Sequence, residues 1–228
     1  MCHKACLDFV EKAFADCDFD GLNVLEVGSY DFNGSARGII KRHHPKSYLG
    51  VDILNGPGVD KVCAASDLCS KFGANAFDVV VSTEMLEHVE DWRCAIKNLK
   101  GVLKPGGVLL ITTRSKGFPY HGYPYDFWRY EVEDFKRIFS DMEIIDLEPD
   151  AEAPGVFLKA VKRGAADASV ADDDLALYSI RSGARTKQVP PLAMRIKCLT
   201  RLKCLALILR LDRCIPKGLR ERLNSKIA

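Results

Sequence analysis

The hydrophobic positions between residues 22 and 161 follow two patterns that alternate along the chain. Short apolar runs rich in Val, Ile and Leu are separated by segments in which apolar residues recur every three or four positions. This alternation is typical of β–α–β units, in which parallel strands form one sheet and helices cover its faces. The runs that predict strands are 23–27, 47–52, 61–64, 78–82, 108–112, 142–149 and 155–161.

The clearest helix prediction covers residues 92–103. One face of this segment is apolar and consists of Ala95, Ile96, Leu99, Val102 and Leu103. The sequence KPGG at 104–107 ends the pattern, because proline and glycine cannot continue a helix. Further helices are predicted at 5–15, 35–43 and 132–139.

The alternation of predicted strands and helices ends at residue 163. Residues 164–190 begin with GAADASVADDD, which offers little to bury and predicts a linker or exposed loop. Residues 191–228 have strong helical propensity and apolar positions nearly all round the helix. We interpret them as a helical extension that packs against its own domain or a partner. A peripheral contact with an anionic membrane surface is the alternative. The main domain would then occupy residues 1–163.

Composition limits the classes of protein that the chain could represent. With 228 residues it has room for one substantial domain and an appendage, since domains usually hold roughly 100–200 residues. The net charge of +2 combines a net −5 in residues 1–163 with a net +7 in residues 164–228. The nine cysteines are an odd number without CxxC spacing, so we expect reduced thiols. The first twenty residues do not form a secretory signal, and no apolar run reaches the roughly 18–20 residues of a membrane span, so we expect a cytoplasmic protein.

The first predicted strand leads into a candidate ligand-binding loop. The sequence VLEVGSYDFNGS ends the strand in glycine and then enters a helix, so its backbone could approach a ligand closely. The loop lacks both GxGxxG and GxxxxGK[ST], which argues against a pyrophosphate ligand. Asp52 ends the next strand, about twenty residues later, where an acid can accept hydrogen bonds from ribose hydroxyls. Asp67, Ser82, Thr83 and Glu84 follow later strands, so all these residues would meet at one edge of the sheet.

These motifs resemble those of the class I S-adenosylmethionine-dependent methyltransferases, in particular the type 11 group. The stretches EVGSYDFNGS, YLGVDI, ASDL, FDVVVSTEMLEHVEDW and LKPGGVLLITT occur in the order of that family, between residues 21 and 161. The resemblance implies a Rossmann-like, doubly wound α/β fold with a mostly parallel seven-stranded sheet and helices on both faces. It also implies S-adenosylmethionine as the cofactor.

The resemblance further implies which residues bind this cofactor. The first motif would lie under the methionine part and shape its pocket with Glu26, Gly28, Ser29, Asn33 and Gly34. Asp52 would hold the ribose, Asp67 and Leu68 the adenine edge, and the backbone of Ser82 would lie near the sulfonium. An acid beside the loop also suits a cationic methyl donor.

The aromatic-rich segment at 113–135 is the candidate acceptor region. It resembles the H-x-x-P-x-D-[FY]-[WY]-R-[FY] stretch of methyltransferases of polysaccharide or glycolipid synthesis, and it contains His121, Asp126 and Arg129. We predict catalytic roles for these three residues, with His121 as the group that contacts or deprotonates an acceptor. The alternative is that they tie the loop together by hydrogen bonds.

Glu84, Glu87 and His88 form an ExxEH sequence whose side chains would share one side of a turn. Such a set could hold a divalent ion, but the same run also fits an ordinary capped turn, and we expect no metal. Two classes of function remain open. The first is O-methylation of a sugar-like or lipid-linked acceptor by a methyltransferase, with no nucleic acid expected. The second is a non-catalytic methyltransferase-like subunit that docks a partner or a membrane through its basic tail. Metal-assisted methylation of RNA or a quinone precursor is a further alternative.

Overall fold

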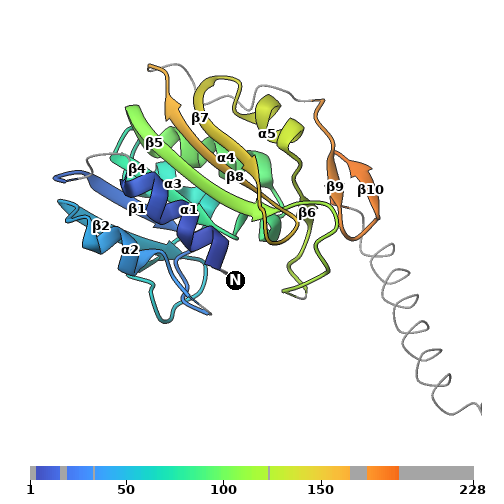
Figure 1. Ribbon diagram of the computed structural model, residues 1–228, viewed down its shortest axis with the longest axis horizontal. Coiled ribbons are helices and arrows are strands. Elements are labelled where there is room, and N and C mark those ends of the chain that lie inside the picture. The colour runs from blue at the N-terminus through green and yellow to red at the C-terminus, as the bar shows by residue number, and fades with distance from the viewer. Residues whose placement is uncertain (1–3, 16–19, 33, 123, 165–173, 190–228) are drawn as a thin grey trace, which may run out of the picture.

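A computed structural model describes residues 4–15, 20–32, 34–122, 124–164 and 174–189 (Figure 1). The predicted helical extension at 191–228 lies outside the described residues, and so does Asn33.

A seven-stranded sheet forms the centre of the domain and confirms the predicted fold class. Its strand order is β3-β2-β1-β4-β5-β8-β7. The first five strands in this order run parallel, whereas β8 is antiparallel to both of its neighbours. The strands are β1 Asn23–Val27, β2 Ser47–Asp52, β3 Lys61–Val62, β4 Phe77–Thr83, β5 Leu103–Arg114, β7 Met142–Pro149 and β8 Gly155–Lys162.

Two strands differ from the prediction by more than one residue at an end. β3 ends at Val62, two residues early, and the 3₁₀ helix η1 follows at Ala65–Asp67. β5 begins five residues early, directly after the helix α4 at Trp92–Val102. The KPGG sequence therefore ends the helix as predicted, but it then forms a bulged start of the next strand, with Gly106 at φ +76°.

Helices cover both faces of the sheet, as Figure 1 shows. Alternate strand residues point to opposite faces, so Val79 and Val81 pack with α1 and α2, whereas Val80 packs with α4. The helices not yet given are α1 Lys4–Ala15, α2 Arg37–Arg42, α3 Leu68–Phe72 and α5 Val132–Ile138, with the 3₁₀ helix η2 at Leu86–His88.

A second, three-stranded sheet contains part of the segment for which we predicted a linker. Its order is β10-β9-β6, with β6 at Trp128–Arg129, β9 at Leu177–Ser179 and β10 at Ala184–Thr186. Leu175 and Leu177 are buried in the main hydrophobic core, so residues 174–189 are packed structure rather than a linker. The pattern missed them because each strand has only three residues and gains its burial from distant parts of the chain.

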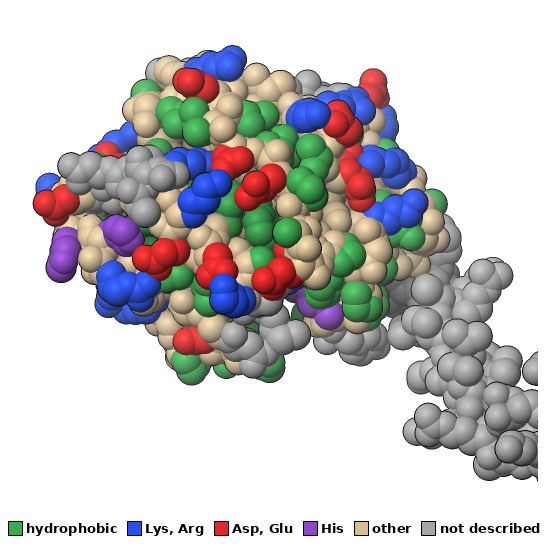
Figure 2. Space-filling model, in the orientation of Figure 1, with side chains coloured by type: hydrophobic (Ala, Val, Ile, Leu, Met, Phe, Trp, Pro, Cys, Tyr) green, Lys and Arg blue, Asp and Glu red, His purple; other side chains and the backbone are tan. Residues whose placement is uncertain are grey.

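One face of the domain mixes charges. Figure 2 shows Lys and Arg side chains interspersed with Asp and Glu on the face in view. None of the helices in the described ranges has the length and apolar character needed to cross a bilayer. Among the described residues, Cys6, Cys63, Cys69 and Cys94 do not form disulfides.

Leu177 provides a test of the second sheet. We expect Leu177→Ala to lower the free energy of unfolding by about 2–5 kcal/mol, the usual cost of a cavity left by a buried leucine. The control is Ile145→Ala on β7, whose side chain is 52% exposed and whose loss should cost far less. Chemical denaturation of both variants measures the difference. Equal stabilities would show that residues 174–189 do not contribute to the core.

Candidate active site

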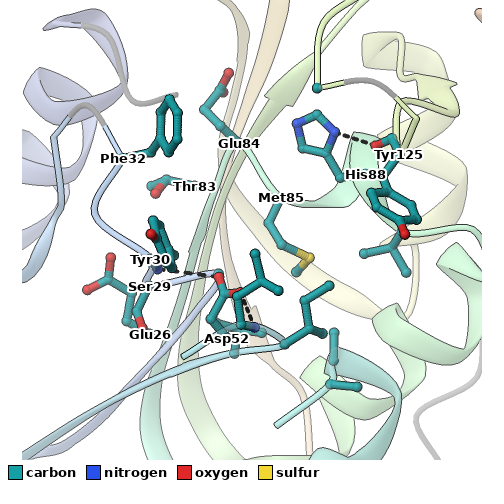
Figure 3. Close-up of a pocket in the computed structure, with 18 of the residues that line it drawn as sticks. Glu26, Ser29, Tyr30, Phe32, Asp52, Thr83, Glu84, Met85, His88 and Tyr125 are labelled. Carbon is teal, nitrogen blue, oxygen red and sulfur yellow. Dashed lines mark hydrogen bonds between the residues drawn. The ribbon is translucent and has the colours of Figure 1, made fainter. Parts of the chain in front are cut away.

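A cavity of about 770 Å³ opens at the carboxyl ends of β1, β2 and β4. Ligands of doubly wound sheets bind at this edge, where the strand order reverses, and the volume suits a small-molecule ligand. In Figure 3, Asp52 and Tyr30 lie on one side of the cavity and His88 and Tyr125 on the other, with Met85 between them.

The glycine loop after β1 forms one wall. Gly28 has φ +84°, and a Cβ added to it would lie 2.7 Å from the Cβ of Met85, so the position admits no side chain. The amides of Gly28 and Ser29 both donate to the carbonyl of Val51, at 2.9 and 3.1 Å, which fixes the loop against β2. Together these contacts keep the backbone close to whatever binds in the cavity.

Asp52 lies at the end of β2, as predicted, and its carboxylate is held by the loops around it. One oxygen accepts a hydrogen bond from the amide of Leu54 at 2.9 Å, and the other from the amide of Tyr30 at 3.3 Å. Each carboxylate oxygen can accept further bonds, so the side chain suits the ribose role that we predicted.

Glu26 is buried at the base of the same wall. Burial raises the pKa of its carboxyl to about 7, although the hydroxyl of Tyr48 donates a hydrogen bond to it. A carboxyl in this state is close to half ionised at neutral pH. A cation bound nearby would therefore stabilise its charged form.

The remaining predicted cofactor residues occupy different places. Gly34 lines the cavity beside Ser29. Asp67 and Leu68 are not among the residues that line it, since Leu68 is buried in the core, and residues 63–66 form that wall instead. Ser82 is fully buried, and the next residue of β4, Thr83, faces the cavity because side chains alternate along a strand. The cofactor roles of all these residues stay predictions.

The predicted catalytic residues divide into a cavity residue and a buried pair. His121 lines the cavity, but Asp126 and Arg129 are fully buried and do not. The guanidinium of Arg129 binds both oxygens of Asp126, at 2.6 and 2.8 Å, and also donates to the carbonyls of Phe118 and Pro119. This geometry corresponds to the alternative in which the pair ties the loop together.

His121 is held between two carboxylates. Its Nδ1 lies 3.2 Å from Asp126 Oδ2, and its Nε2 lies 3.6 Å from Glu87 Oε1. Burial alone would lower the pKa of His121, but Asp126 and Glu87 raise it to about 9. The ring is therefore protonated at neutral pH, where it donates hydrogen bonds and does not accept a proton. The predicted role as a base stays a prediction that this arrangement does not favour.

The side chains of Glu84, Glu87 and His88 do not all lie on one side of a turn, as we had predicted. Glu84 has φ +54° and turns toward Arg114, with which it forms a buried ion pair, and it accepts a hydrogen bond from Cys6 at 3.3 Å. Burial and the charge of Glu87 raise the pKa of Glu84 to about 7. Glu87 and His88 instead lie beside His121, which only the folded loop brings to them.

Comparison with known proteins identifies the family. Residues 2–147 match the family model described as a methyltransferase domain, and the match covers more than half of the chain. The chain belongs to this methyltransferase family.

Two curated relatives share part of this domain. A highly reducing polyketide synthase of Emericella nidulans is 30% identical over 146 residues, which is 57% of this chain and 6% of the synthase. The ubiquinone biosynthesis O-methyltransferase of Parvibaculum lavamentivorans is 31% identical over 68 residues, which is 30% of this chain and 26% of that enzyme. The chain thus spans about a quarter or less of the length of these relatives.

A solved structure shares the fold. The 1,6-didemethyltoxoflavin-N1-methyltransferase of Burkholderia thailandensis, determined with bound S-adenosylhomocysteine, superposes with a TM-score of 0.57 at 15% identity. The match covers 70% of this chain and 79% of that protein. At this identity the likeness supports the class I α/β fold.

Asp52 allows a direct test of the predicted ribose site. We expect Asp52→Ala to weaken S-adenosylmethionine binding roughly 10- to 100-fold, because hydrogen bonds to a charged acceptor are worth about 1.5–3 kcal/mol. Isothermal titration calorimetry measures the affinity. The control is Glu143→Ala, an exposed carboxylate on β7 outside the cavity. Unchanged affinity in Asp52→Ala would refute the ribose assignment.

Glu26 predicts a pH dependence of donor binding. Because its pKa is raised to about 7, the carboxyl of the free protein holds a proton below that pH and releases it above. If the cationic donor binds beside the ionised form, affinity should rise roughly ten-fold between about pH 6 and pH 8. The Glu26→Gln variant cannot ionise at this position. The difference between its pH profile of donor affinity and that of the unmodified protein therefore gives the effect of Glu26 alone, without the titration of the donor or of Glu84. Parallel pH profiles would exclude Glu26 from donor binding.

Proposed function

We propose that this protein is an S-adenosylmethionine-dependent methyltransferase that methylates a hydroxyl group of a small sugar-like or lipid-linked acceptor. The observation that carries the proposal is a single cavity with two distinct halves. The half near Gly28 and Asp52 suits a nucleoside cofactor, and the half near His88, His121 and Tyr125 is open for an acceptor.

The donor half fits S-adenosylmethionine by its chemistry. Gly28 leaves the backbone accessible, Asp52 presents carboxylate oxygens, and Glu26 can balance a positive charge. Bound here, the cofactor would supply a methyl group on a sulfonium, which is transferred by in-line displacement. The chain contributes chiefly by placing the acceptor oxygen in line, and positioning of this kind can provide much of the rate acceleration.

The acceptor half combines an apolar rim with polar groups deeper inside. Tyr125 lines this half with its side chain 63% exposed, and Phe32 lines the facing wall with its side chain 75% exposed (Figure 3). Large exposed aromatic groups at a cavity mouth favour an acceptor with an apolar part or a ring on which they can stack. The imidazoles of His88 and His121 can hydrogen-bond its hydroxyl. The ubiquinone relative, by its name an O-methyltransferase, supports oxygen as the methylated atom.

The described surface gives less support to a nucleic-acid acceptor. Binding to a phosphate backbone depends on clustered Lys and Arg, whereas the face in Figure 2 mixes both signs of charge. The basic segment at 191–228 lies outside the described residues.

The function is tested by donor consumption. Purified protein and labelled S-adenosylmethionine are incubated with sugar, lipid-linked, small aromatic and RNA acceptors, and formation of S-adenosylhomocysteine is measured. We expect turnover with a hydroxyl-bearing small molecule. Donor binding without turnover on any acceptor would favour the non-catalytic subunit.

Tyr125→Ala tests the acceptor half once an acceptor is known. Loss of the exposed ring should raise the KM for the acceptor roughly ten-fold and leave donor affinity unchanged, since a stacking contact is worth about 0.5–1.5 kcal/mol. The matched control is Tyr120→Ala, a tyrosine of the same loop that does not line the cavity. Equal KM values for the two variants would place the acceptor elsewhere.

A further inference from the structure

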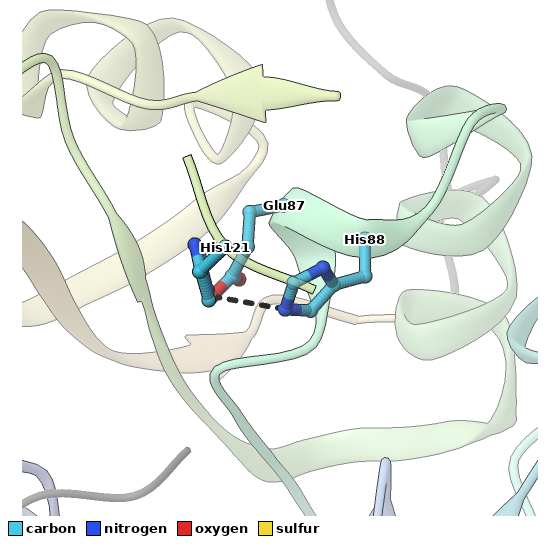
Figure 4. Close-up of side chains that lie close together, drawn as sticks. All are labelled: Glu87, His88 and His121. Carbon is cyan, nitrogen blue, oxygen red and sulfur yellow. Dashed lines mark ion pairs between the residues drawn. The ribbon is translucent and has the colours of Figure 1, made fainter. Parts of the chain in front are cut away.

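Three potential ligand atoms converge at the acceptor end of the cavity (Figure 4). Glu87 Oε1 lies 3.8 Å from His88 Nε2 and 3.6 Å from His121 Nε2, and all three atoms are within 4.8 Å of one another. Two of the residues come from η2 and the third from the loop after β5, so the group exists only in the folded protein.

Each of these side chains is oriented by a second contact on its other polar atom. The hydroxyl of Thr113 donates to Glu87 Oε2 at 2.8 Å. His88 Nδ1 lies 2.6 Å from the carbonyl of Tyr125, and His121 Nδ1 lies 3.2 Å from Asp126 Oδ2. Metal-binding histidines are usually oriented in this way, with the free ring nitrogen donating to a carbonyl or carboxylate.

The chain also packs closely around His88. A Cβ added to Gly122 would lie 2.7 Å from His88 Cε1, so a glycine is needed for the loop to approach the ring. Gly122 has φ +66°, a conformation that glycine adopts readily. The loop thus holds the imidazole against Glu87.

One of the three converging atoms, the buried oxygen Glu87 Oε1, has no hydrogen bond in the described structure. A carbonyl can only accept, so His88 Nδ1 carries a hydrogen, and Nε2 is the ring nitrogen left to bind an ion. Glu87 is fully buried, and within the described part of the chain its Oε1 accepts no hydrogen bond. The imidazole nitrogens of His121 and His88 lie 3.6 and 3.8 Å from this oxygen, which is too far for a hydrogen bond, and an ion bound among the three atoms would satisfy the oxygen.

We propose that Glu87, His88 and His121 bind a divalent transition-metal ion. Two imidazoles and one carboxylate favour ions such as Zn²⁺, Fe²⁺ or Co²⁺ over Mg²⁺ and Ca²⁺, which prefer oxygen ligands. Ligand atoms about 2.0–2.2 Å from such an ion lie roughly 3.0–3.5 Å from one another, so the distances of 3.6 and 3.8 Å from Glu87 to the two imidazoles need only a small contraction. From the sequence alone we expected no metal, and this proposal replaces that expectation. The proposed site differs from the ExxEH set because its third ligand is His121 and not Glu84.

The site also extends the proposed function, on which this step rests. Three protein ligands leave positions open on the ion, and His88 and His121 both line the cavity. An acceptor hydroxyl bound at an open position would have a lowered pKa, because the ion stabilises the oxyanion. Binding of the ion would displace the Nε2 proton of His121. The acceptor hydroxyl would then release its proton to water, which leaves a nucleophilic oxygen on the ion.

The test uses Co²⁺ as a spectroscopic probe. The full chain, prepared without a histidine tag and freed of metal with EDTA, is titrated with Co²⁺ while visible absorption is recorded. We expect one ion per chain with the d–d bands of a nitrogen- and oxygen-ligated site. His88→Gln and His121→Gln should each weaken binding more than about 100-fold, beyond the 10- to 100-fold cost of losing an outer contact.

Two further variants separate the site from surface binding and from misfolding. Thr113→Val removes only the outer hydrogen bond to Glu87 and should weaken Co²⁺ binding about ten-fold. His44→Asn removes an exposed histidine elsewhere, at a position with φ +49° that asparagine tolerates, and should leave binding unchanged. Donor affinity, measured by calorimetry on each variant, shows that the fold is intact.

The outcomes distinguish this proposal from the proposed function. No stoichiometric Co²⁺ binding, or binding that survives both histidine substitutions, would overturn the metal site even if donor binding and methyl transfer are intact. Conversely, Co²⁺ binding in a protein that neither binds nor consumes the donor would retain the metal site and refute the methyltransferase proposal.

Discussion

The burial of carboxyl groups at the carboxyl end of the sheet is the constraint on which the site depends. Glu26, Glu84, Glu87 and Asp126 all lie there, nearly or fully buried. A charge removed from water is costly unless it is paired or neutralised. Three of these carboxyls are stabilised in different ways. Glu26 has a raised pKa and accepts a hydrogen bond from the hydroxyl of Tyr48. Glu84 forms an ion pair with Arg114, and Asp126 pairs with Arg129 and His121. Within the described structure, Glu84 Oε2 and Glu87 Oε1 both lack a hydrogen bond, but Glu84 Oε2 lies against the guanidinium of Arg114, whereas the groups near Glu87 Oε1 are the imidazoles of His88 and His121, at 3.8 and 3.6 Å.

The pairing of these groups also shapes the acceptor loop. Arg129 binds the carboxylate of Asp126 and also donates to the carbonyls of Phe118 and Pro119 in the loop. Arg181, in the turn between β9 and β10 of the second sheet, donates a hydrogen bond of 3.1 Å to the carbonyl of Asp126. The second sheet in turn is anchored by Leu177 in the core and by Arg185, which pairs with Asp134 at 2.7 Å. A segment distant in sequence therefore supports the loop that carries His121. Sites held by such contacts can keep their side chains in one geometry.

The two halves of the cavity differ in what fixes them. The donor half is built from strand ends and a glycine loop, whose backbone geometry follows from the parallel sheet. The acceptor half is built from side chains of η2 and of a long loop, and its polar groups are positioned by buried pairs. This division agrees with a family in which one cofactor is used with many acceptors, since loops vary more readily than strand ends.

The sequence by itself determined the main sheet, the helices α1, α2, α4 and α5, and the position of Asp52 and Gly28 at the edge of the cavity. Hydrophobic periodicity and strand-end residues are local signals, and the rule that parallel strands present their carboxyl ends on one side converts them into a site. Only the tertiary structure decided that residues 174–189 belong to the core, that Arg129 and Asp126 are a buried pair, and that Glu84 turns to Arg114. Only it placed His121 beside Glu87 and His88. The Arg129–Asp126 pair spans three positions, but the contacts of Glu84 with Arg114 and of Glu87 with His121 join residues 30 or more positions apart. The pairing of buried charges is settled by three-dimensional proximity that no local pattern encodes.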